Sequence, residues 1–279
     1  MEFTIAHGTG NDFVVLPDPQ GALELSDALV QRVCDRRFGI GGDGVLRIVR
    51  TAAAGEAVPD SEDCEFFMDY RNADGSAAQM CGNGARVFVQ YLWDAGLAPV
   101  GQVRFATRGG ARVAWPVPGG VCVDMGHAVL GETDGVTVSA AGHRWPATAV
   151  HVPNPHAVAF VADLADPGPL LDRPGLDPAD SYPDGANVEF VVVRGPHHIA
   201  MRVHERGVGE TLSCGTGACA AAVAYLLTRT GDSAGVVRVD VSGGTLQVQV
   251  RDDRTVTLAG PTATVAEGRI HAGWLEGPQ

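Results

Sequence analysis

Residues 218–228 constrain the fold most strongly, because this helix-forming segment, ACAAAVAYLLT, is apolar on nearly every face. A helix without a polar face has to be buried on all sides rather than laid on the surface of a sheet. We therefore expect a strongly curved sheet wrapped around it. The segment follows Ser-Cys-Gly-Thr-Gly, so that Cys214 stands at the start of the helix and Gly231 follows its end.

The same context occurs about half a chain earlier, where Cys81 stands in Met-Cys-Gly-Asn-Gly before a predicted helix at 85–94. In both places Cys-Gly-polar-Gly precedes a helix, and Asn83 and Thr216 are the predicted N-cap residues. The repeat predicts an α+β fold of two pseudo-symmetric domains, each a curved sheet or barrel around a central helix. We place them at 1–122, joined by a returning strand within 268–279, and at 123–267.

Short β-rich runs separated by Gly and Pro fill most of the remaining chain. The runs are 45–50, 64–69, 103–107, 121–125, 157–161, 188–193, 199–204, 236–241 and 245–250. A further helix is predicted at 26–37, with Ser26 as its N-cap and Gly39 after its end. The Pro-rich segment 166–184 is predicted to be a surface excursion.

The composition excludes several classes of function. The net charge is −13, which argues against nucleic acid or an anionic membrane as partner. All 20 basic residues other than histidine are arginine, so neither a lysine Schiff base with pyridoxal phosphate nor a Walker phosphate loop is possible. The usual zinc spacings and a secretion signal are also missing. We expect a cytoplasmic protein with no zinc or other metal site and no pyridoxal phosphate cofactor.

Two cysteines at two helix N-termini indicate a specific chemistry. The unpaired N–H groups there can lower a thiol pKa and can bind a carboxylate. If the two halves face each other, one thiolate removes an α-proton while the other thiol delivers a proton to the opposite face. That is cofactor-independent racemisation or epimerisation.

A purely structural role is the alternative for each cysteine, because cysteine is among the most buried residue types. It is the favoured interpretation for Cys34, Cys64, Cys122 and Cys219. For Cys81 and Cys214 the repeated context and the lack of lysine favour catalysis.

Five motifs resemble the diaminopimelate epimerase family, in family order over almost the whole chain. They are HGTGNDFVV at 7–15, NADGSAAQMCGNGAR at 72–86, NPHAV at 154–158, GANVEFV at 185–191 and ERGVGETLSCGTGACAAA at 205–222. The resemblance implies a cofactor-independent isomerase that interconverts LL- and meso-diaminopimelate for lysine and peptidoglycan-precursor synthesis. It also implies a homodimer in the bacterial cytoplasm.

The resemblance further implies a role for each matching residue. Cys214 would accept the α-proton in the LL-to-meso direction and Cys81 would donate one, with His156 and Glu205 tuning the thiols. The implied substrate contacts are Asn11, Asn72, Gly82, Asn83, Asn154, Asn187, Glu205, Arg206, Gly215 and Thr216. Arg206 suits a carboxylate and Glu205 an ammonium, as a second, non-reacting centre of a diamino diacid requires.

This sequence departs from the family pattern at two positions. Gly44 stands where the family often has glutamine, so that one ligand contact would be absent or supplied otherwise. Pro153 replaces a glycine before Asn-Pro-His, which would alter how the loop presents Asn154 and His156.

Three other functions compete with this interpretation. A sister racemase of proline or hydroxyproline would leave Arg206 without a carboxylate. A thiol redox sensor would link Cys81 to Cys214, although Cys-x-x-Cys is missing. A non-catalytic amino-acid-binding protein would tolerate the loss of both thiols, and α-proton exchange without added cofactor separates it from the enzyme.

Overall fold

The computed structural model describes residues 1–131 and 135–275. The chain divides into two compact units. Unit 1 comprises Met1–Val123 together with the described residues from Pro261 onward, and unit 2 comprises Asp124–Gly260. Each unit contains one of the two helices that begin at a cysteine, and each is described by itself below.

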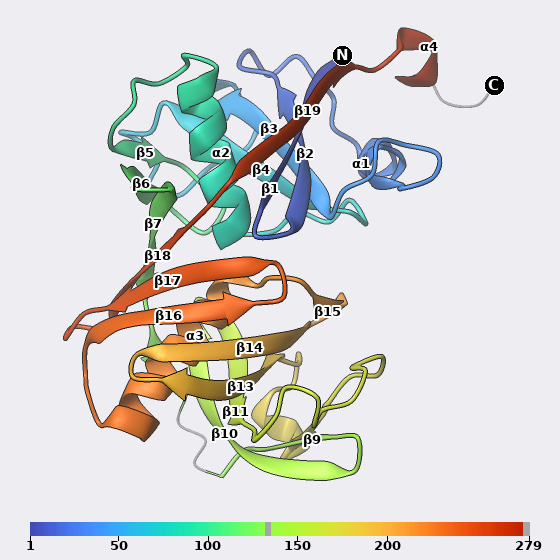
Figure 1. The fold of residues 1–279 in the computed structure, drawn as a ribbon. Coiled ribbons are helices and arrows are strands. Elements are labelled where there is room, and N and C mark those ends of the chain that lie inside the picture. The colour runs from blue at the N-terminus through green and yellow to red at the C-terminus, as the bar shows by residue number, and fades with distance from the viewer. Residues whose placement is uncertain (132–134, 276–279) are drawn as a thin grey trace. The chain divides into compact units, whose positions relative to one another are not determined.

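Unit 1 is built on a five-stranded sheet in the order β19-β1-β2-β3-β4 (Figure 1). The strands are β1 (Glu2–Gly8), β2 (Asn11–Pro17), β3 (Gly44–Arg50), β4 (Phe66–Asn72) and β19 (Ala263–Arg269). Helix α1 (Asp27–Cys34) packs on one face through Val30 and Val33, against Val14 and Val45. Because strand side chains alternate between faces, Phe13 and Leu46 lie on the other face, against helix α2 (Gly82–Asp94).

Shorter elements complete unit 1. They are η1 (Thr51–Ala53), β5 (Val103–Phe105), β6 (Arg112–Val117), β7 (Gly120–His127), whose last residues lie in unit 2, and α4 (Ala272–Leu275). Strand β6 pairs antiparallel with both β5 and β7. None of these elements contains a predicted site residue.

In unit 2 the strands follow the order β12-β9-β10-β11-β13-β14-β16-β17-β18, with β8 paired to β10 and β15 to β14. Their bounds are β8 (Val129–Leu130), β9 (Thr137–Ala140), β10 (His143–Val152), β11 (Asn154–Phe160), β12 (Gly175–Asp177), β13 (Asn187–Gly195), β14 (His198–Glu205), β15 (Gly209–Thr211), β16 (Gly235–Val241), β17 (Gly244–Val250) and β18 (Thr255–Gly260). The remaining elements are η2 (Ala179–Ser181), helix α3 (Gly215–Tyr225) and the π-helical turn η3 (Leu226–Thr230).

Helix α3 is buried along its entire length, as its sequence predicts. Strands β10, β11, β13, β14, β16, β17 and β18 all contact it, so that the sheet curves around the helix. After η3 the chain leaves through Gly231 at a φ of 79°, a left-handed conformation that glycine adopts without strain. The α+β fold with curved sheets is therefore confirmed, whereas the barrel is not. The sheet of unit 1 ends at β19 on one side and β4 on the other.

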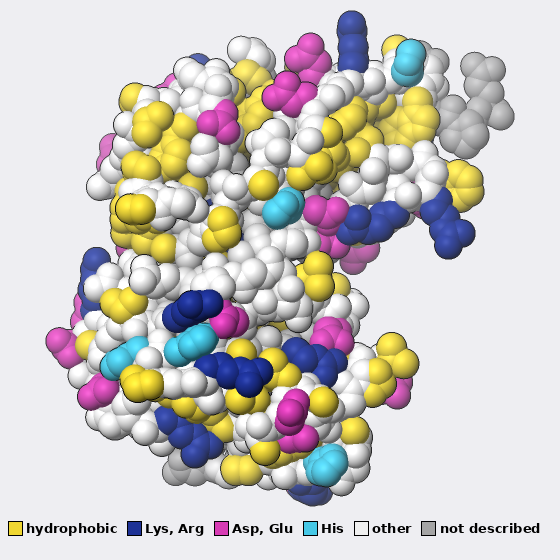
Figure 2. All heavy atoms as spheres, viewed as in Figure 1, with side chains coloured by type: hydrophobic (Ala, Val, Ile, Leu, Met, Phe, Trp, Pro, Cys, Tyr) yellow, Lys and Arg dark blue, Asp and Glu magenta, His cyan; other side chains and the backbone are white. Residues whose placement is uncertain are grey.

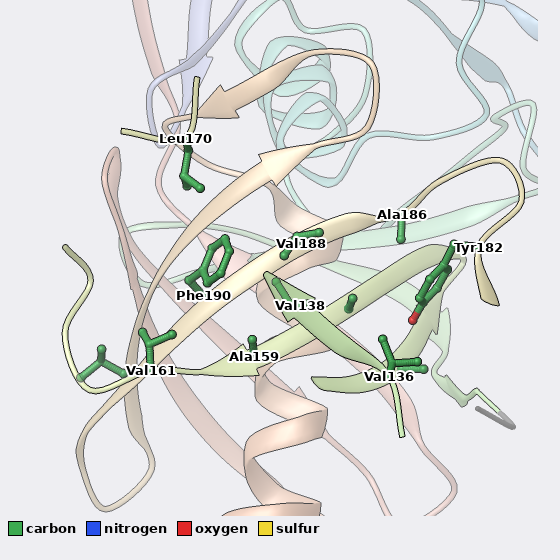
Figure 3. Close-up of a cluster of buried hydrophobic side chains, with 12 residues drawn as sticks. Val136, Val138, Ala159, Val161, Leu170, Tyr182, Ala186, Val188 and Phe190 are labelled. Carbon is green, nitrogen blue, oxygen red and sulfur yellow. The ribbon is translucent and has the colours of Figure 1, made fainter. Parts of the chain in front are cut away.

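The opposite face of the unit 2 sheet carries its own hydrophobic cluster (Figure 3). Val188 and Phe190 of β13 pack there with Leu170 and Tyr182. The segment 166–184 is thus not only a surface excursion, because these two side chains are buried and cover the sheet. Its many prolines and charged residues hide this role in the sequence.

Each predicted strand overlaps an observed one, and Ser26 caps α1 as expected, accepting a hydrogen bond from Leu29 N. The returning strand β19 begins earlier than the predicted 268–279, of which 276–279 lie outside the described residues. Nearly all of its side chains are exposed, so it lacks the alternation of apolar and polar residues that would have marked it.

Charged side chains of both signs are interspersed over the face of each unit seen in Figure 2. Within the described residues, no helix is long and apolar enough to cross a membrane.

Candidate active site

Cys81 itself organises the N-terminus of α2, and this end of the helix is called its mouth below. Cys81 is the N-cap of the helix, and its Sγ accepts a hydrogen bond from Gly84 N at 3.4 Å. The predicted cap, Asn83, instead lies in the first helical turn and is almost completely buried. The thiol therefore occupies the position where helix N–H groups and the positive end of the helix dipole favour negative charge.

Asn11 at the start of β2 is held between Asp43 and Cys81. Its Nδ2 donates to Asp43 Oδ2 at 2.9 Å, while its Oδ1 lies 3.8 Å from Cys81 Sγ and accepts from Asn83 Nδ2 at 3.3 Å. The structure thus brings three of the predicted residues together in unit 1. Asn72, at the end of β4, donates to Ser76 Oγ instead.

A fully buried arginine binds residues of the first turn of the same helix. Arg86 donates to Thr9 Oγ1 at 3.2 Å, to Asn83 Oδ1 at 3.1 Å and to the carbonyl oxygen of Gly82. Gly8 allows this approach, since a Cβ there would lie 3.0 Å from the guanidinium. A positive charge is therefore fixed beside the first turn of α2.

The mouth of α3 repeats the capping geometry. Cys214 is the N-cap, and its Sγ accepts from Gly217 N at 3.4 Å and lies 3.4 Å from Thr216 Oγ1. Thr216, the predicted cap, is again a first-turn residue. Hydroxyl and amide groups are the common N-caps, and for this reason the sequence pattern points to Asn83 and Thr216 rather than to the cysteines.

The electrostatic surroundings of Cys214 differ from the expectation. Burial, together with the nearby carboxylates of Glu205 and Glu189, raises the pKa of the Cys214 thiol well above 9.0. Burial also raises the pKa of Glu205, whose carboxylate accepts a hydrogen bond from Thr211. The predicted lowering of the thiol pKa is wrong for Cys214, because burial and two carboxylates outweigh the helix N-terminus.

His156 on β11 lies between two oxygen acceptors. Its Nδ1 is 2.7 Å from Glu189 Oε1 and its Nε2 is 3.0 Å from Asn154 Oδ1. Tyr182 donates to the backbone oxygen of His156 at 3.1 Å. Pro153, at the turn between β10 and β11, leaves Asn154 and His156 in mutual contact.

Asn187 and Arg206 are joined through the backbone. The Asn187 Oδ1 atom accepts from Arg206 N at 2.8 Å, and the exposed Arg206 guanidinium reaches the Asp184 carbonyl oxygen at 3.5 Å. Among the described residues no carboxylate forms an ion pair with it. The guanidinium is thus exposed and accessible to a solute.

Gly44 has a steric reason to be glycine. A Cβ at this position would lie 2.5 Å from the Arg71 carbonyl oxygen and 2.7 Å from Tyr70 Cε2, closer than Cβ atoms of folded proteins approach other atoms. The strand pair β3–β4 therefore leaves no room for the glutamine common in the family. The contact that such a side chain would make is absent from this chain.

Three residues of these two sites escaped the sequence analysis, namely Asp43, Arg86 and Glu189. A signal existed for Glu189, since one acidic residue interrupts the apolar run of β13, and a charge in a doubly covered strand rarely lacks a function. Arg86 ends the motif at 72–86 and Asp43 precedes Gly44, but nothing in the pattern says which partner each contacts.

No group of three or more His, Cys, Asp or Glu side chains suited to a metal ion occurs in the described part of the chain. A hollow of about 490 Å³ in unit 2 is lined by 234–236 and 249–253 and includes none of the predicted site residues.

Known proteins with similar sequences decide the family. The family model described as diaminopimelate epimerase matches residues 3–131 and 148–265. This chain belongs to the diaminopimelate epimerase family. It is 53% identical to the diaminopimelate epimerase of Streptomyces coelicolor (strain ATCC BAA-471 / A3(2) / M145), over 99% of this chain and 98% of that protein. The corresponding protein of Thermobifida fusca (strain YX) is 46% identical over 99% of this chain and all of that one.

Comparison with solved structures shows that this chain shares its fold with more distant proteins. A phenazine biosynthesis protein of the PhzF family from Bacillus anthracis superimposes with a TM-score of 0.67 at 14% identity, covering 97% of this chain and 99% of that one. A hydroxyproline epimerase from Agrobacterium vitis gives 0.65 at 17% identity, covering 96% and 91%. The family membership makes this chain an isomerase and favours the diaminopimelate epimerases over the sister racemases.

Proposed function

We propose that this chain interconverts LL- and meso-diaminopimelate without a cofactor, with Cys81 and Cys214 as the two proton-transfer groups. The observation that carries the proposal is the shared capping geometry. Each Sγ accepts from the N–H three residues later at the start of a buried helix. Each thiol is thereby held next to N–H groups that can bind the substrate carboxylate and stabilise its enolate-like charge.

The active form of the pair carries one proton, because one sulfur must accept while the other donates. Burial and the nearby carboxylates raise the pKa of Cys214 and so favour this proton on Cys214. Cys81 is then the base that removes the α-proton of meso-diaminopimelate, and Cys214 delivers its proton to the other face. In the LL-to-meso direction the roles are exchanged.

The remaining predicted residues are assigned to two parts of the substrate, the reacting centre and the distal centre. Gly82, Asn83, Gly215 and Thr216 belong to the two first helical turns and would hold the reacting carboxylate and amine. Asn11, Asn72, Asn154 and Asn187, with Glu205 and Arg206, would hold the distal amino-acid centre. The exposed Arg206 guanidinium is available to a second carboxylate, which proline does not possess.

We place this reaction in lysine and peptidoglycan-precursor synthesis, in the bacterial cytoplasm and in a homodimer. The chain is large and has its six cysteines as free thiols, which supports a reducing compartment.

The test measures α-proton exchange of LL-diaminopimelate in deuterated water without added cofactor, for the unmodified protein and for Cys81→Ala and Cys214→Ala. We expect exchange and epimerisation in the first and loss of epimerisation in both variants, with unchanged circular dichroism. Substantial epimerisation by either folded variant would exclude the two-thiol mechanism. Absence of exchange in the unmodified protein would exclude the reaction itself.

A further inference from the structure

Glu189 is the acidic side chain that the proposed mechanism does not yet use. It lies on β13 between Val188 and Phe190, which point into the hydrophobic cluster of Figure 3. Alternation along the strand directs Glu189 to the opposite face, toward α3, where the side chain is completely buried.

Only one of the two oxygens of this carboxylate has a hydrogen-bond partner among the described residues. Oε1 lies 2.7 Å from His156 Nδ1, whereas Oε2 has no hydrogen-bond partner in the described residues. A buried carboxylate oxygen without a partner costs free energy that a buried apolar side chain would avoid. Such a cost is typical of a group retained for function rather than stability.

The carboxylate also lies against the first turn of α3. A Cβ placed on Gly217 would be 2.7 Å from Glu189 Oε1 and 3.3 Å from Cys214 Cβ, so that the acid and the cysteine flank one glycine. At the equivalent glycine of α2, Gly84, the three atoms nearest to an added Cβ are carbons of Leu46, Cys81 and Phe13. The two helix mouths are therefore alike in backbone and different in charge.

We propose that Glu189 is a positioning residue for Cys214, fixing His156 through Nδ1 and holding the transferable proton on Cys214 by its negative charge. The inference rests on the proposed function, since it assigns that proton to the two-thiol reaction. With Nδ1–H donated to the carboxylate, the ring is oriented so that Nε2 faces Asn154, a predicted substrate contact. Gly217 is required because any side chain there would displace the acid.

The other charged groups near Cys214 are few. Glu205 on β14 is the second carboxylate, His156 on β11 is the imidazole that Glu189 binds, and His151 on β10 lies near that imidazole. Tyr182 lies near the carboxylate of Glu189. The buried side chains of β16, β17 and β18 are valines, leucines and one threonine. Burial and two carboxylates thus act on one thiol, consistent with the raised pKa of Cys214.

The experiment compares the unmodified protein with Glu189→Gln, which keeps the shape and an acceptor for His156 but removes the charge. The ultraviolet absorbance of thiolates is measured as a function of pH in each protein and in the same protein carrying Cys214→Ala. The difference between the two curves reports the ionisation of Cys214 alone. We expect Cys214 in Glu189→Gln to lose its proton about one pH unit lower, the size of shift that one nearby charge produces. The falling, basic limb of the kcat/KM profile moves the same way, because it reports loss of the last proton of the pair.

Glu189→Asp, which retains the charge, should keep the titration of Cys214 high even where the shorter side chain lowers kcat. Glu210→Gln, which removes an exposed carboxylate from β15, is the matched control and leaves both curves in place. Gly217→Ala should reproduce the Glu189→Gln shift by displacing the acid, whereas Gly84→Ala should not.

An unchanged Cys214 titration in folded Glu189→Gln would overturn the inference, as would an equal shift in Glu189→Asp. The titration needs no substrate, so the test of Glu189 remains valid even if the protein does not turn over diaminopimelate. Conversely, turnover by the unmodified protein with an unchanged Cys214 titration would leave the proposed function intact and remove only the role of Glu189.

Discussion

The side-chain amide of Asn11 donates to Asp43 at 2.9 Å while its carbonyl oxygen faces the sulfur of Cys81 at 3.8 Å. Asp43 thereby decides which end of the amide the thiol meets. Arg36 donates to Asp43 at 2.9 Å and keeps the carboxylate in place. A residue on a loop outside the helix thus controls a polar contact of the proposed catalytic thiol.

Asp43→Asn should lower kcat/KM about tenfold, a loss of ~1.4 kcal/mol, because the Asn11 amide loses its ionised acceptor and can rotate. Steady-state kinetics on diaminopimelate measures this. Asp35→Asn is the control, since Asp35 accepts from Arg37 and Phe38 in the same loop and does not contact Asn11. An equal loss in both variants would mean that loop stability, not Asn11, explains the effect.

Gly44→Ala should destabilise unit 1 by about 1–3 kcal/mol, because the added carbon would overlap the Arg71 carbonyl and the Tyr70 ring. Gly44→Gln should do the same and not improve substrate binding. Urea unfolding measures the change in free energy. At Gly195, the last residue of β13, a Cβ would meet no atom within 4 Å, so Gly195→Ala should be nearly neutral. A stable Gly44→Gln with a lower KM would contradict this interpretation.

Arg206→Met should reduce kcat/KM for diaminopimelate about ten- to a hundredfold and leave the already poor use of lysine unchanged. The reason is that only diaminopimelate offers a second carboxylate to the exposed guanidinium. Arg194→Met, which removes another exposed arginine of unit 2, serves as the control. If the unmodified protein uses lysine or proline as efficiently as diaminopimelate, the assignment of the substrate fails.

Asp240 on β16 provides a pH-dependent contribution to stability. Hydrogen bonds from His198, Thr245 and Arg238 outweigh burial and lower the pKa of this carboxyl from 3.8 to about 2. A lowered folded-state pKa stabilises the protein above the unfolded value and loses that contribution as the pH falls toward 2.

Asp240→Asn should therefore cost about 1 kcal/mol, allowing for solvent screening of this partly exposed group, between pH 5 and 7. The difference from the unmodified protein should shrink below about pH 4. Urea unfolding across this range checks the sign. A difference that grows on acidification would show that the carboxylate is not the source.

The sequence predicted the buried helices and most strands, because burial of one or more faces appears in the sequence as a pattern of apolar residues. An all-apolar helix at 218–228 required a sheet around it, and the strand runs followed from their β-branched residues. The strand β19 escaped because its side chains are exposed, and its pairing with β1 is made by backbone atoms that carry no sequence signal.

The helix mouths show where sequence reasoning ends. Repetition identified Cys81 and Cys214, but the opposite charges behind them come from Arg86 on α2 itself and from Glu189 on a strand 25 residues before Cys214. The direction of the Cys214 pKa shift depended on these tertiary neighbours, so the helix N-terminus alone predicted the wrong sign.

The pairing of β1 with β19 also has a consequence for synthesis on the ribosome. Unit 2 is continuous from Asp124 to Gly260 and can fold as soon as it has emerged, whereas unit 1 has to wait for Ala263–Arg269. Until then β1 presents an unpaired edge that another nascent chain could occupy. The half of the protein that is made first is therefore the half that is finished last.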